Sequence, residues 1–162
     1  MSEPIESDVT ELLQLKEQEQ TLLLEELDGL LDSLTGNEKL QPYIDLRQSI
    51  QSGQVPEHLM PTLENTLLMT LQSGRIRRRH SPQAEQVLQR LFNRTPRGEI
   101  LCRSSKDTSQ ALAALQGQAL DHISITPKTP GVYRMTIDTD QCQITLEFTP
   151  DGVSVTGMGV GI

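Results

Sequence analysis

Residues 132–148 read VYRMTIDTDQCQITLEF, and they alternate between apolar and polar side chains on both sides of a short polar loop. This alternation predicts two half-buried strands, because successive side chains of a strand point to opposite faces. The residues between them, 138–141, predict a hairpin loop. The turn Pro150-Asp151-Gly152 and the segment 153–156 predict a third strand. We therefore expect a three-stranded antiparallel meander with one apolar and one polar face.

The segment that precedes the meander has mixed periodicity. Residues 99–102 predict a short strand, and residues 106–116 predict a helix that Ser104 or Ser105 caps. A further strand is expected around Leu120, Ile123 and Ile125, and Pro127 and Pro130-Gly131 are expected to break the chain. After the last strand, the glycine-rich residues 157–161 predict a frayed tail.

Leucines at helical spacing dominate the first half of the chain. They predict helices over 8–34, 38–52 and 57–73, and residues 82–93 predict another helix with Ser81 as N-cap and Pro82 at its first position. The strongest apolar stripe is Leu22–Leu34, and acidic residues flank it. Two interpretations stay open, because such a stripe suits either docking to a partner or packing on the neighbouring helices.

Together these patterns predict an α+β protein. An N-terminal region of about three helices is followed by a small domain with two helices and a mainly antiparallel sheet. The expected boundaries are a disordered tail over 1–7, an acidic helical region over 8–74, a basic junction over 75–81 and an α+β domain over 82–162.

Charge is distributed unevenly along the sequence. Residues 1–74 hold 14 acidic and 3 basic side chains, and residues 107–162 hold 6 acidic and 2 basic ones. Residues 75–106 hold 9 basic and 2 acidic side chains, although the net charge of the whole chain is −8. We call residues 75–106 the basic block. Its cations are Arg75, Arg77, Arg78, Arg79, Arg90, Arg94, Arg97, Arg103 and Lys106.

The basic block has two interpretations. Guanidinium groups match phosphate oxygens, so arginines 75–97 predict a nucleic-acid-binding patch. The block also follows a strongly acidic helical region, and it can pair with that region inside the molecule or with an acidic partner. We prefer pairing, because the chain is acidic overall and no nucleic-acid recognition motif accompanies the arginines.

Composition argues against several other classes of protein. Aromatic residues make up 2 % of the chain, which disfavours stacking platforms for single-stranded nucleic acid. The three histidines and two cysteines show no metal-binding spacing and no catalytic signature. No segment is apolar enough over about 20 residues to predict a membrane span. The acidic start, MSEPIESDVTE, is unlike a signal peptide, and a cytoplasmic location is expected.

We therefore expect a non-catalytic interaction, assembly or regulatory protein without cofactor or metal, and nucleic-acid binding is the alternative. Its partner would be another protein or a second copy of the chain. The expected partner-binding residues are Arg75, Arg77, Arg78, Arg79, Arg90, Arg94, Leu24, Leu27 and Leu31.

Overall fold

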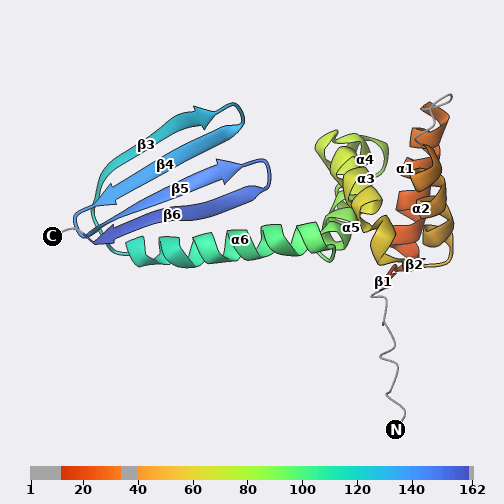
Figure 1. The fold of residues 1–162 in the computed structure, drawn as a ribbon, viewed down its shortest axis with the longest axis horizontal. Coiled ribbons are helices and arrows are strands. Elements are labelled where there is room, and N and C mark those ends of the chain that lie inside the picture. Colours follow the sequence, from red (N-terminus) through yellow and green to blue (C-terminus); the bar gives the residue numbers. More distant parts are fainter. Residues whose placement is uncertain (1–11, 34–39, 161–162) are drawn as a thin grey trace, which may run out of the picture. The chain divides into compact units, whose positions relative to one another are not determined.

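The computed structural model describes residues 12–33 and 40–160 (Figure 1). Its fold is α+β, as expected, with helices followed by a four-stranded antiparallel sheet. The chain forms two compact units, Met1–Arg97 and Gly98–Ile162. The expected disordered tail, 1–7, lies outside the described residues. We call the two parts the helical unit and the sheet unit.

The helical unit contains the helices that leucine spacing predicts over 38–52, 57–73 and 82–93. In chain order its elements are β1 (Leu13–Gln14), α1 (Glu17–Ser33), α2 (Gln41–Gln51), β2 (Gln54–Val55), the 3-10 helix η2 (Glu57–Leu59), α3 (Met60–Gln72), α4 (Arg75–Arg79) and α5 (Pro82–Phe92). The expected junction at 75–81 is thus itself partly helical.

Helix α1 begins later than the predicted helix over 8–34. The residues before it form β1, in which Leu13 pairs with Val55 of β2. At the helix start, the side chain of Glu19 accepts a hydrogen bond from the backbone N–H of Lys16 at 2.8 Å. This contact is half of a capping box, and it satisfies a donor that the first turn leaves unpaired. Residues 8–11 of the predicted helix lie outside the described residues.

The core of the helical unit is aliphatic. Leu23 and Leu27 of α1 have no exposed surface, and neither have Leu46 of α2, Leu63 of α3 and Leu88 of α5. Helix α1 packs against α2 and α5, and α3 packs against α5. The leucine stripe of α1 therefore packs inside the unit over much of its length.

Helix α5 belongs to the helical unit, whereas the sequence placed it in the second domain. Its start is as predicted, because the Ser81 hydroxyl accepts a hydrogen bond from the backbone N–H of Ala84 at 3.2 Å. Its apolar face, with Leu88 and Leu91, packs against α1, α3 and α4. The division between the units falls in the first turn of the next helix instead.

The sheet unit contains one long helix before the strands, where a strand and a shorter helix were expected. Its elements are α6 (Pro96–Leu112), the 3-10 helix η3 (Ala113–Leu115), β3 (Leu120–Thr129), β4 (Val132–Thr139), β5 (Cys142–Thr149) and β6 (Gly152–Val160). The strand prediction over 99–102 is wrong, because Pro96 starts a helix and Glu99 lies in its favourable first turn. Ser104 and Ser105 are consequently mid-helix residues and not caps.

The strands follow one another in the sheet as an antiparallel meander in the order β3-β4-β5-β6. Cross-strand pairs align the apolar residues in rows on one face, as the alternation predicts. The rows are Ile123–Ile137–Ile144–Met158, Ile125–Met135–Leu146–Val155 and Pro127–Tyr133–Phe148–Val153. We call this surface the apolar face.

The glycine-rich segment after residue 156 differs from the predicted frayed tail. Gly159 pairs with Gln143 and Val160 pairs with Cys142, so the segment continues β6 along β5. Glycine tolerates strand geometry, and backbone pairing does not require side chains.

On each of the two edge strands, β3 and β6, one backbone hydrogen-bonding group is missing or already paired. Strand β3 includes Pro127, which has no N–H to donate and is accepted in an edge strand. On β6, the carbonyl oxygen of Val153 accepts hydrogen bonds from the hydroxyl groups of Ser104 and Thr108 of α6. These bonds place α6 beside the start of β6.

Candidate functional site

The basic block directs several of its cations toward the acidic helix α1. Arg79 of α4 lies 3.7 Å from Glu26, measured between Nη1 and Oε1. His80 follows, with its Nε2 at 3.3 Å from Oε2 of Glu25. Both contacts join the segment after α3 to successive positions of α1. The acidic helix and the basic block are thus complementary within the helical unit.

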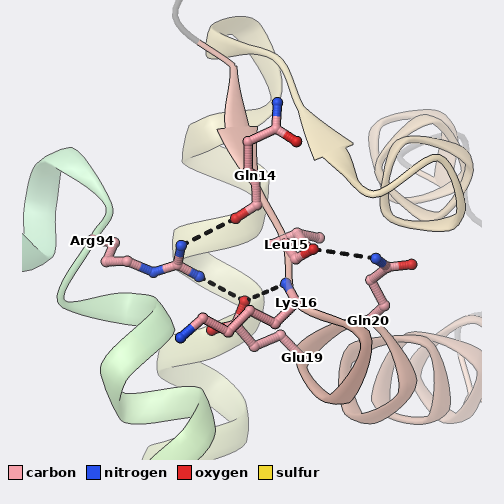
Figure 2. Close-up of polar contacts among 6 residues, drawn as sticks. All are labelled: Gln14, Leu15, Lys16, Glu19, Gln20 and Arg94. Carbon is pink, nitrogen blue, oxygen red and sulfur yellow. Dashed lines mark hydrogen bonds and ion pairs between the residues drawn. The ribbon is translucent and has the colours of Figure 1, made fainter.

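A short ion pair joins Arg94, which follows α5, to the start of α1 (Figure 2). Nη2 of Arg94 lies 2.6 Å from Oε2 of Glu19, and its Nη1 donates to the carbonyl oxygen of Gln14 at 3.1 Å. The side chain of Glu19 is only 4 % exposed. The same carboxylate oxygen also accepts from Lys16, so the Glu19–Arg94 pair joins β1, the start of α1 and the residues after α5.

Other arginines of the block have local contacts. Arg77 pairs with Glu85, at 2.7 Å between Nε and Oε2, and its side chain is 66 % exposed. Arg78 donates from Nη2 to the carbonyl oxygen of Ser73 at 3.0 Å. The guanidinium of Arg75 lies over Gly29, 3.7 Å from the point where a Cβ atom would stand. Arg90 is exposed on α5.

The three leucines expected at a partner interface differ in exposure. Leu27 has no exposed surface, and it therefore cannot contact a partner while the helical unit is folded. Leu24 and Leu31 are half-buried. For Leu27 the structure corrects the expected role: this residue belongs to the core, because α1 uses its stripe against α2 and α5.

A cavity of about 180 Å³ lies in the helical unit beside the Glu26 side chain. The side chain of Glu26 is 3 % exposed, and its Oε1 atom has no hydrogen-bond partner. Buried polar atoms of proteins nearly always have such a partner, so this carboxylate is an exception. The cavity is lined by Glu26 and Leu30 of α1, by Thr66, Met69 and Thr70 of α3, and by Ser73 and Arg75.

The apolar face of the sheet unit is another open feature. Ile144 and Leu146 of the inner strand β5 are buried, but the rows extend outward to side chains that remain exposed. The exposed fractions are Ile123 48 %, Ile125 60 %, Tyr133 48 % and Met158 54 %. Beside the sheet, a groove of about 480 Å³ lies between α6 and β6. The exposed part of the apolar face therefore lies on β3 and β4, and the buried side chains of β5 separate it from Met158 on β6.

The described residues offer few other sites. None of their His, Cys, Asp and Glu side chains form a group of three or more that could hold a metal ion. Cys102 and Cys142 are free thiols. The side chain of Asp28 accepts a hydrogen bond from Arg47, and this bond and its charge raise the pKa of the Arg47 guanidinium. Within these residues no helix has the length and hydropathy that a membrane crossing requires.

Sequence reasoning found the basic block and the two-faced sheet, but it did not find the cavity. The i, i+4 spacing of Glu26 and Leu30, and of Thr66 and Thr70, places each pair on one helix face. That spacing alone does not say which faces meet. A comparison of the chain with protein-family models, curated proteins and solved structures found no match.

Proposed function

We propose that this protein is a non-catalytic assembly protein that associates with a second copy of itself through the apolar face of its sheet. The observation that carries the proposal is the set of exposed apolar side chains on the paired strands β3 and β4, which includes Ile123, Ile125 and Tyr133. Single exposed apolar residues are common, whereas a continuous patch of them marks an interaction surface.

The patch has the size and shape of an interface. Its exposed members present on the order of 500 Å², which is near the upper range for patches on monomers. When two such faces meet they approach the roughly 1,000 Å² in total that a specific interface requires. Two twisted sheets pack well face to face, with their side chains interdigitated.

A second copy suits this face better than a charged partner does. All residues of the three cross-strand rows are uncharged, so the face offers no charge for an acidic or basic partner to recognise. The opposite face carries Arg134, Asp138 and Glu147, which remain in water when the apolar faces meet. A twofold axis brings identical surfaces together and makes the contact self-complementary.

In this proposal the basic block has an internal role. Arg79 and Arg94 face carboxylates of α1, and Arg77 faces Glu85. Cations held in this way are less free to replace the counterions of a nucleic acid, which is the main source of non-specific nucleic-acid affinity. These contacts therefore support the assembly proposal over nucleic-acid binding.

The test is the mass of the protein in solution, measured by light scattering after size exclusion. We expect the full chain to show twice the monomer mass of 18.1 kDa. Ile125→Asp places a charge in the middle of the proposed interface and should weaken association at least about tenfold. The matched control is Thr126→Asp, which puts the same charge on the neighbouring residue of the opposite face.

Two results would contradict the proposal. One is a full chain that stays monomeric at the highest concentration reached. The other is a dimer that Ile125→Asp and Thr126→Asp weaken equally, because such a dimer would not depend on the apolar face. Circular dichroism of both variants verifies that the sheet unit still folds.

A further inference from the structure

The cavity beside Glu26 is polar on its inner side and partly apolar where it reaches the surface. Glu26, Thr66 and Thr70 line the inner side, and each is at most 6 % exposed. Met69, which is 46 % exposed, and the exposed Arg75 line the outer side. A ligand that enters therefore meets a guanidinium and a thioether first, and then hydroxyl groups and a carboxylate.

The Oε1 atom of the Glu26 carboxylate receives no hydrogen bond from the residues around it. This atom is buried, and the nearest guanidinium nitrogen, on Arg79, is 3.7 Å away. This distance is too long for a hydrogen bond. A buried charged group without its hydrogen bonds is unfavourable, so a ligand that brings a donor to this oxygen gains affinity.

The charges around the cavity select against a simple cation. Arg75 lines the cavity, and Arg79 lies next to the carboxylate, so a metal ion or a plain amine would be repelled by two guanidinium groups. A single carboxylate is also a poor set of ligands for a divalent ion. A molecule with a cationic donor at one end and an anionic acceptor near it satisfies both Glu26 and Arg75.

The volume and the lining of the cavity restrict the class of ligand further. A cavity of about 150 Å³ accommodates a molecule the size of benzene, and this one measures about 180 Å³. Leu30 and Met69 provide apolar contact for a short hydrocarbon group.

We propose that this cavity binds an α-amino acid with an aliphatic side chain. Its ammonium group would face Glu26 and Thr66, its carboxylate would face Arg75, and its side chain would contact Leu30 and Met69. This site is independent of the proposed self-association.

The test is calorimetric titration of the full chain with L-leucine and with two analogues that each lack one charge. These are 3-methylbutylamine, which has no carboxylate, and 4-methylpentanoate, which has no amine. We expect leucine to bind and each analogue to bind at least about tenfold more weakly, because each loses a charge-assisted hydrogen bond.

Variants assign the binding to this cavity. Arg75→Gln removes an exposed cation and should weaken leucine binding about tenfold while the binding of 3-methylbutylamine falls no further. Glu26→Gln should weaken leucine binding in the same way if the helical unit remains folded. The matched control is Arg77→Gln, which removes the same charge from the same helix outside the cavity and should leave leucine binding unchanged.

The proposal is overturned if leucine and other aliphatic amino acids do not bind at about 10 mM, where even millimolar affinity is detectable. In that case the cavity contains only water. It is also overturned if 4-methylpentanoate binds as well as leucine, or if Arg75→Gln and Arg77→Gln have equal effects. The wild-type comparison of the three probes decides the question even if Glu26→Gln fails to fold.

Discussion

The helical unit and the sheet unit differ in the kind of side chain that they leave exposed to water. The helical unit buries its leucines and brings acidic and basic side chains together, as Glu19 and Arg94 show. The sheet unit has charged and polar side chains on one face and leaves much of its apolar face exposed, as at Ile125. The helical unit thus pairs many of its charged side chains within itself, whereas the sheet unit leaves apolar side chains exposed that the proposed second copy would cover.

The largest effect on stability is expected from a loss of core volume in the helical unit. Leu27→Ala deletes a side chain with no exposed surface and should lower the free energy of unfolding by about 2–5 kcal/mol. Urea denaturation followed by far-UV circular dichroism, which reports mainly on the helices, measures the change. A loss below about 1 kcal/mol would mean that Leu27 does not lie in a tight core.

A second, smaller effect should come from the buried ion pair. Arg94→Ala removes the cation that faces the nearly buried Glu19 and should cost about 1–3 kcal/mol, because the carboxylate keeps only its bond from Lys16. Arg77→Ala is the matched control. It removes an exposed cation from an exposed pair and should cost less than about 1 kcal/mol. Equal costs for the two variants in the same denaturation experiment would mean that the buried Arg94–Glu19 pair stabilises the fold no more than the exposed Arg77–Glu85 pair does.

The smallest effect is expected on the apolar face. Ile123→Thr keeps a β-branched side chain on an outer strand and should change the free energy of unfolding by no more than about 0.5 kcal/mol in dilute solution. Its melting temperature should depend less on protein concentration than that of the parent chain, because a dimer gains stability by mass action. A large loss of stability in the dilute monomer would mean that the face is packed inside the chain.

Regular periodicity made much of the fold predictable. Alternation over 132–148 predicts both faces of β4 and β5, and leucine spacing predicts α3 and α5. The short apolar run Ile100-Leu101-Cys102 was misassigned because a run of this length fits a strand or a helix equally well. Only the extension of α6 from Pro96 resolves the ambiguity.

The candidate sites depend on contacts that no local pattern contains. Arg94 and Glu19 are 75 residues apart, and charge totals indicated only that the two regions were complementary. The position of Glu26 beside Thr66 and Thr70 follows from the approach of two helices, and single residues do not specify that approach. The openness of the apolar face was equally hidden, because alternation predicts which side chains share a face but not what covers them.

The outer strands of the sheet have a consequence for how far association can proceed. Open sheets can grow without limit when new strands add to their edges, which is how fibrils form. In this sheet Pro127 interrupts the row of donors on one edge, and α6 occupies the carbonyl of Val153 on the other. The proposed association through the faces would instead cover the exposed apolar side chains in one contact. With their edges blocked in this way, the sheets would form a closed pair rather than a filament.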